Sequence, residues 1–75
     1  MSWRVELARS SEKQLRRLPK REIFRIEKVL EGLEQNPFAG DVVKLGGEGN
    51  VWRRRVGNYR IIYEPEIHTK IVFVY

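Results

Sequence analysis

The stretch WRRRVGNYRIIYE at residues 52–64 has the pattern of a β-hairpin, because two runs of strand-forming residues flank a short turn signal. Gly57-Asn58 at its centre suits a two-residue turn with glycine first, and such a turn fixes which residues face each other. Arg55 is then directly opposite Arg60. Like charges in that position cost roughly 0.2 to 1 kcal/mol, so the pair predicts an anionic ligand, with a phosphate as the first candidate.

The two faces of this hairpin differ in chemistry, because successive side chains of a strand point to opposite sides. Strict alternation places Arg54 on the apolar face, where it either snorkels past an edge of the sheet or is turned outward by a bulge. The apolar face predicts a core. The cationic face holds Arg53, Arg55, Arg60 and Ile62, and the apolar face holds Trp52, Val56, Tyr59, Ile61 and Tyr63.

The composition favours an anionic partner. The net charge is +5 on 75 residues, which is typical of a protein that binds nucleic acid or an acidic protein, although a merely soluble basic domain has the same charge. The chain has no cysteine, so we expect no disulfide and no thiolate nucleophile. With a single histidine and no carboxylates at ligand spacing, we expect no metal and no cofactor.

The sequence predicts a single domain over residues 1–75, in the cytoplasm. The N-terminus lacks an apolar signal segment, and no run approaches the ~20 apolar residues of a membrane span. A domain of this size buries only roughly 60% of its unfolded surface. A permanent partner would therefore stabilise it considerably.

The first half of the chain predicts a strand and two helices. Alternation of apolar and polar residues over 3–7 indicates a half-buried strand. Ser11 and Gln14 have the spacing of a capping box for a short helix that Pro19 ends. A second helix is expected from about Lys20 to Gln35, with Phe24 roughly opposite its apolar stripe. That stripe comprises Ile23, Ile26, Val29, Leu30 and Leu33.

The second half predicts strands. Residues 36–50 are loop-like, although 42–45 could form a short extended piece. After the hairpin, residues 70–75 are apolar on both faces and predict a central or covered strand. The expected fold is α+β, with a helical hairpin packed on one face of a mainly antiparallel sheet and the order β-α-α-β-β-β.

These residues resemble the RelE/ParE superfamily of toxin–antitoxin toxins, and the RelE branch in particular. The resemblance rests on Lys44-Leu45, a glycine-containing turn and residues 51–64, together with LRRLP at 15–19. It implies a RelE-like fold and a ribosome-dependent endoribonuclease that cuts messenger RNA by attack of a ribose 2′-OH on the adjacent phosphate. It also implies an acidic, RelB-like antitoxin as partner. The family's catalytic basic residues correspond to Arg53, Arg55 and Arg60.

Parts of the family's site have no counterpart here. The family places lysines where this chain has Arg53 and Arg55, and arginine cannot easily act as a general base because its side chain keeps its proton. His68 is expected in a surface turn far from Gly57-Asn58. The family usually continues with a further basic residue and a tyrosine, whereas this sequence stops at Tyr75, which does not match that tyrosine. The resemblance then implies either a shortened form with weak or no nuclease activity, or a reaction in which the ribosome and the substrate supply more of the chemistry than usual.

Further basic residues are candidates for RNA contact. Those at the junction of the two helices form either a solvated helix surface or a footprint for ribosomal RNA. Two other functions remain open: a ParE-like inhibitor of DNA gyrase without catalysis, and an inactive, shortened homologue that binds an antitoxin. The candidate RNA-binding residues are Lys44, Arg54, Arg16, Arg17, Lys20 and Arg21, and Arg25 belongs to the same junction cluster.

Overall fold

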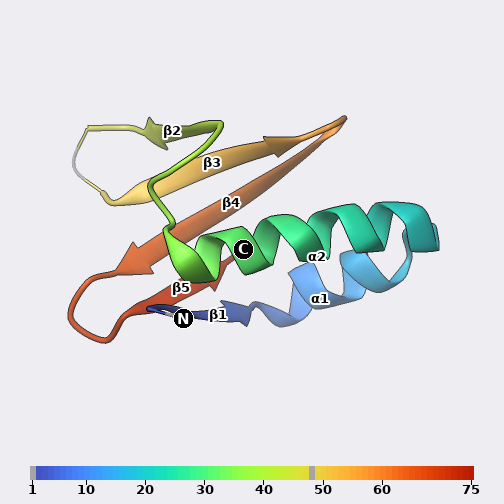
Figure 1. Cartoon of the computed structure of the whole chain (residues 1–75), viewed down its shortest axis with the longest axis horizontal. Helices are drawn as coiled ribbons and strands as arrows, with labels where there is room; N and C mark the ends of the chain where they lie inside the picture. The colour runs from blue at the N-terminus through green and yellow to red at the C-terminus, as the bar shows by residue number, and fades with distance from the viewer. Residues whose placement is uncertain (1, 48) are drawn as a thin grey trace.

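The computed structural model describes residues 2–47 and 49–75, and over these ranges the chain forms two helices and five strands (Figure 1). In chain order these are β1 (Arg4–Leu7), α1 (Arg9–Arg16), α2 (Lys20–Gln35), β2 (Val42–Leu45), β3 (Val51–Val56), β4 (Tyr59–Glu66) and β5 (Ile71–Val74).

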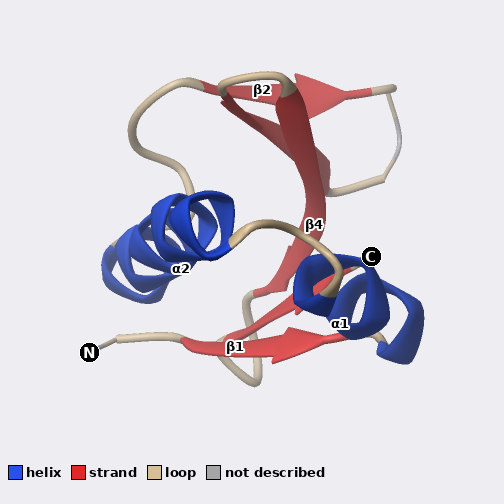
Figure 2. Ribbon diagram, turned by 90° about the vertical axis from the view of Figure 1, so that its right-hand side faces the viewer, coloured by secondary structure: helices blue, strands red, loops and turns tan. Residues whose placement is uncertain are grey.

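The strands of the described residues make one sheet in the order β1-β5-β4-β3-β2. The β1–β5 pair is parallel, and the other three pairs are antiparallel. Figure 2 shows the sheet curving around α2, with β1 and β2 at opposite ends. The predicted α+β fold is confirmed, including the central position of β5. The short piece at 42–45 proves to be a fourth strand after the helices, because it pairs along β3.

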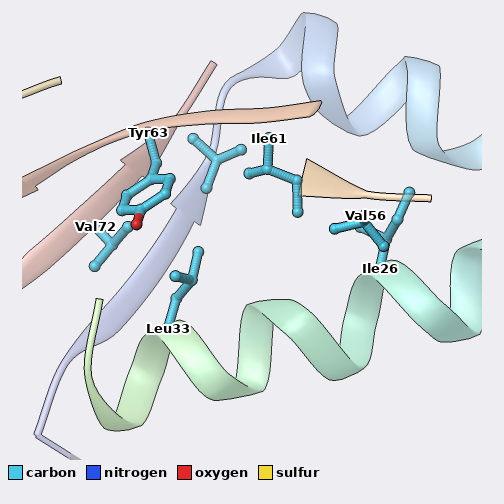
Figure 3. Packing of buried hydrophobic residues seen from close by; sticks show 7 residues of the cluster. Ile26, Leu33, Val56, Ile61, Tyr63 and Val72 are labelled. Carbon is cyan, nitrogen blue, oxygen red and sulfur yellow. The ribbon is translucent and has the colours of Figure 1, made fainter. Parts of the chain in front are cut away.

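The core lies between α2 and the sheet (Figure 3). Leu33 is 2% exposed, and Tyr63 and Val72 are 0% exposed. The helical stripe therefore packs against the predicted apolar face of the hairpin, and the α1 region reaches the same core through Leu15 and Leu18. Both helices thus pack against the same face of the sheet.

Tyr63 also connects the loop after α2 to the sheet through a hydrogen bond. Its hydroxyl donates a hydrogen bond to the Pro37 carbonyl oxygen at 2.5 Å. Burial raises the pKa of this hydroxyl to about 12, and the positive charge of Arg54 opposes part of that rise.

The predicted capping box at Ser11 is wrong. The first helix already begins at Arg9, with Ala8 as its N-cap and no side-chain cap. The reason is tertiary: the Ala8 backbone N–H donates to the Val74 carbonyl oxygen, so pairing with β5 decides where β1 ends and the helix begins. Ser11 consequently lies inside the helix, where its hydroxyl is buried without a hydrogen-bond partner among the described residues.

The second helix has the predicted bounds. Pro19 occupies its N-cap position, where proline fits because no helical N–H is required there. Asn36 ends it in an extended conformation before the buried Pro37. Phe24 is 60% exposed, and the Lys28 ammonium lies 5.3 Å from the centre of its ring.

Candidate functional site

Three arginines of the β3–β4 hairpin lie on the side of the sheet that faces away from the helices. Arg55 stands directly opposite Arg60, and Arg53 stands opposite Ile62, as the hairpin pattern predicted. Arg55 and Arg60 are exposed, and Arg53 is half-buried. Within residues 2–47 and 49–75, none of the three takes part in a salt bridge or a side-chain hydrogen bond. We call Arg53, Arg55 and Arg60 the arginine face.

The chemistry available to the arginine face is anion binding. Guanidinium groups without carboxylate partners present rigid pairs of N–H donors that match phosphate oxygens. Three of them on one surface can hold a phosphodiester and stabilise the charge that grows on its oxygens during displacement. Proton transfer requires some other group.

The turn between β3 and β4 brings a further cation to the hairpin. Gly57 has a φ of 58°, a left-handed conformation that glycine adopts without strain. A Cβ atom at this position would lie 3.0 Å from the Arg25 guanidinium of α2. Arg25, which also pairs with Glu22 at 3.6 Å, therefore lies against the turn that joins Arg55 to Arg60.

Two of the predicted RNA-binding residues lie on the helix side of the sheet instead. Arg54 is paired with Ile61, and Lys44 is paired with the core-facing Trp52, so neither shares a surface with the arginine face. The β3–β4 pairing runs without interruption past Arg54, which favours snorkelling over a bulge. Its guanidinium lies 3.4 Å from where a Cβ on Gly40 would be, near the end of α2. Partial negative charge at a helix C-terminus suits a cation there.

The remaining predicted RNA-binding residues lie around the α1–α2 junction and are exposed. Figure 1 shows this junction and the β3–β4 turn at the same end of the molecule. Arg16 is already occupied, because it pairs with Glu12 at 2.6 Å. Arg17, Lys20 and Arg21 complete the group, and Arg25 links it to the hairpin turn.

Glu64 and Tyr75 were not among the candidates, yet both belong to the surface of the arginine face. The Tyr75 hydroxyl donates a hydrogen bond to a Glu64 carboxylate oxygen at 2.7 Å. This hydrogen bond is the main cause of a raised pKa of the Tyr75 hydroxyl. Their proximity depends on the register between β4 and β5, which could not be predicted from the sequence.

His68 lies in the turn between β4 and β5 and is exposed. That turn is at the end of β4 opposite to Gly57-Asn58, as expected for a surface histidine. Neighbouring Thr69 donates from its backbone N–H to the Glu66 carboxylate at 2.8 Å, which is the largest cause of the lowered pKa of Glu66.

An apolar groove of about 340 Å³ opens between α1, α2 and the sheet. Arg17 and Arg60 line it together with Tyr75, so the groove borders the arginine face. Its apolar lining includes Leu7, Leu15, Leu18, Ile26, Leu30 and Val74.

Over the described ranges, no helix combines the length and the apolar content required to cross a membrane. The same residues contain no group of three or more histidine, cysteine, aspartate or glutamate side chains placed to hold a metal ion.

The fold is that of RelE toxins. The archaeal RelE–RelB complex from Pyrococcus horikoshii OT3 matches with a TM-score of 0.89 and 33% identity, over 99% of this chain and 90% of the matched chain. The toxin–antitoxin complex RelBE2 from Mycobacterium tuberculosis matches with a TM-score of 0.84 and 20% identity, over 99% of this chain and 93% of the other. The intact Escherichia coli RelBE complex matches with a TM-score of 0.81 and 20% identity, over 96% of this chain and 89% of the matched chain.

The family can be stated more closely from the sequence. The model of the ParE toxin of type II toxin–antitoxin systems, parDE, matches residues 5–75. The chain therefore belongs to this toxin family, within the RelE/ParE superfamily. A comparison with curated protein sequences returns no match.

Proposed function

We propose that this toxin is a RelE-like, ribosome-dependent endoribonuclease that cleaves messenger RNA in the cytoplasm. The observation that carries the proposal is the arginine face itself: Arg55 and Arg60 are opposed and exposed, and neither has an acidic partner within residues 2–47 and 49–75. Opposed like charges destabilise a sheet by a few tenths of a kcal/mol or more, so a phosphate above them relieves a cost that the free protein bears.

In this mechanism the arginine face holds the scissile phosphodiester of a messenger RNA. The ribose 2′-OH attacks the adjacent phosphorus, and Arg53, Arg55 and Arg60 stabilise the negative charge on the non-bridging oxygens. Such preorganised donors typically contribute a factor of about 10²–10³ each. The ribosome contributes the conformation of the RNA, which aligns the 2′-OH with the bond that breaks.

The ribosome is expected to contact the toxin at the α1–α2 junction. Arg17, Lys20 and Arg21 are exposed there, and Arg25 continues the positive surface to the hairpin turn. A single electropositive surface around one end of the molecule suits ribosomal RNA on one side and messenger RNA on the other.

Cleavage can be tested by primer extension on a translated message. We expect the wild-type chain to cut within codons being read, and Arg55→Ala to lower the cleavage rate by about 10²–10³-fold. Lys28→Ala is the matched control, because Lys28 is an exposed cation on α2, which packs on the opposite side of the sheet from the arginine face. Arg53→Lys distinguishes two roles: activity persists if only positive charge matters, and it rises if a titratable amine helps as a base.

A gyrase inhibitor is the second candidate function, because the matching family model is that of ParE toxins. A supercoiling assay with purified gyrase separates the two. A chain that leaves translated messages intact and blocks supercoiling is a ParE-like inhibitor. A chain that does neither would favour the inactive, shortened homologue that binds an antitoxin.

The proposed partner is an acidic, RelB-like antitoxin. Two observations support it: the groove of about 340 Å³ is apolar, and the same groove is flanked by Arg17 and Arg60. An amphipathic acidic segment would bury its apolar side there and neutralise one member of the arginine face. Co-expression with the product of an adjacent reading frame should raise the melting temperature, and an unchanged melting temperature would argue against that product as the antitoxin.

A further inference from the structure

The arginine face leaves one chemical task without a residue, namely removal of the proton from the 2′-OH. Arginine side chains keep their protons, so a base that the chain itself provides must be another group on the same surface. Alternation along β4 places Ile62 and Glu64 on the same side as Arg60. Glu64 is half-buried and its carboxylate is fixed by the hydrogen bond from Tyr75.

The polar residues of this surface surround one apolar position, Ile62. Arg53 stands opposite Ile62 on β3, and on the other side the Tyr75 backbone N–H donates to the Ile62 carbonyl oxygen at 2.8 Å. Arg60 and Glu64 are each two residues from Ile62 along β4, which is about 7 Å. A phosphodiester held by the arginines above Ile62 is therefore within side-chain reach of Glu64.

The Tyr75 hydrogen bond gives the Glu64 carboxylate a defined orientation. One carboxylate oxygen accepts from the Tyr75 hydroxyl at 2.7 Å, and the other takes part in no hydrogen bond or salt bridge within residues 2–47 and 49–75. The same contact raises the pKa of the Tyr75 hydroxyl, so the phenol keeps its proton and remains a donor at neutral pH.

Other carboxylates on this side of the sheet have different tasks. Glu66 accepts from both the backbone N–H and the hydroxyl of Thr69, at 2.8 and 3.0 Å, and so holds the β4–β5 turn. Glu6, which stands opposite Phe73, pairs with Arg4 at 3.1 Å. Glu64 is the carboxylate nearest to the arginine face along β4.

We propose that Glu64 is the general base of the cleavage reaction and that Tyr75 is the residue that positions it, an inference that rests on the proposed nuclease function. The Glu64 carboxylate accepts the proton of the 2′-OH while the 2′-oxygen forms a bond to the adjacent phosphorus. The bond from phosphorus to the 5′-oxygen breaks, and that oxygen takes a proton from water. The products are a 2′,3′-cyclic phosphate and a 5′-hydroxyl, and Glu64 returns its proton to solvent.

The test is single-turnover cleavage of a short synthetic message on programmed ribosomes. Glu64→Gln keeps the size of the side chain and an acceptor for Tyr75, and we expect it to lower the rate by about 10²–10⁴-fold. Tyr75→Phe should lower it by about 10-fold or more, because the charged acceptor loses its donor. Glu6→Gln is the matched control and should leave the rate unchanged. Thermal melts of all three variants report whether each is folded.

A second substrate distinguishes a general base from a general acid that protonates the leaving group. Replacing the bridging 5′-oxygen by sulfur makes departure easy without a proton, so loss of a general acid is rescued and loss of a general base is not. We expect folded Glu64→Gln and Tyr75→Phe to remain slow on the sulfur substrate. Restoration of either variant to the wild-type rate would overturn the assignment, because the residue would then serve the leaving oxygen.

The outcomes distinguish this proposal from the function on which it rests. If the wild-type chain and Glu64→Gln both cleave at the same rate while Arg55→Ala does not, Glu64 is not the base and the nuclease function stands. If the wild-type chain cleaves no translated message, both proposals fail together. Retention of activity in Glu64→Asp, above the rate of Glu64→Gln, would support the role of a carboxylate.

Discussion

The two faces of the β3–β4 hairpin use alternate residues of the same strands for opposite purposes. On the helix side, Tyr63 is 0% exposed and Val56 is 7% exposed, and both pack under α2. On the outer side, Arg55 and Arg60 face each other in water. The first face stabilises the fold, and the second is expected to lower its stability slightly, in return for the surface that we propose binds anions.

This difference indicates that residues for stability and residues for chemistry can alternate along the same two strands. Substitutions on the helix side should change the free energy of unfolding and alter cleavage only through loss of folded protein. Substitutions on the outer side should change cleavage with little or opposite effect on unfolding. The predictions below test that separation.

The largest expected effect on unfolding is at Leu33, which is 2% exposed where α2 meets the sheet. Leu33→Ala removes buried methyl groups and leaves a cavity, so the free energy of unfolding should fall by about 2–5 kcal/mol in urea titration. The matched control is Gly32→Ala, at an exposed neighbouring position with open space around it, which should have no such cost. A loss below about 1 kcal/mol at Leu33 would mean that the helix is not packed as described.

On the helix side of the sheet, alkaline pH should lower the stability through Tyr63. Its pKa is about 12 in the folded chain against 10.0 as the ordinary value. The unfolded chain therefore releases this proton first, so stability is complete below pH 10 and declines as pH rises toward 12. The two-unit difference corresponds to at most about 2.7 kcal/mol. Unfolding measured across this range should be flatter in Tyr63→Phe.

Loss of the Tyr63 hydroxyl should have a smaller effect at neutral pH. Tyr63→Phe leaves the buried Pro37 carbonyl oxygen without its donor, which costs about 1–3 kcal/mol in the free energy of unfolding. Tyr75→Phe removes an exposed hydroxyl bond of similar length and should cost less. Equal losses in chemical denaturation of the two variants would contradict the contrast between the faces.

The smallest effect should have the opposite sign. Arg60→Gln removes one of two opposed charges and should raise the free energy of unfolding by roughly 0.2 to 1 kcal/mol at low salt, with the gain vanishing at high salt. The same variant should lose cleavage. A destabilised Arg60→Gln would mean that Arg60 contributes to packing rather than to anion binding.

Much of this fold could be predicted because the helix-ending and turn residues of the sequence agree with the packing of the folded chain. Pro19 and Asn36-Pro37 delimit α2, and Gly57-Asn58 sets the register that brings Arg55 opposite Arg60. The start of α1 could not be predicted, since it depends on a hydrogen bond from Ala8 to a residue near the other end of the sequence.

The site was predictable to the extent that it lies within one hairpin. Arg53, Arg55 and Arg60 share a surface because alternation within paired strands requires it. Lys44 could not be assigned to a side without the β2–β3 register, because β2 is short and lacks an apolar alternation. Glu64 lies in β4 and Tyr75 directly follows β5, so their contact depends on the register between these two strands.

The pairing of β1 with β5 has a consequence for synthesis of the chain. Arg4 lies beside Ile71, so the strand made first has its neighbour only when β5, which follows the other four strands of the described residues, has been made. Contacts between residues so far apart in sequence form late and slowly. We therefore expect β1 to join the sheet only after β5 has emerged from the ribosome.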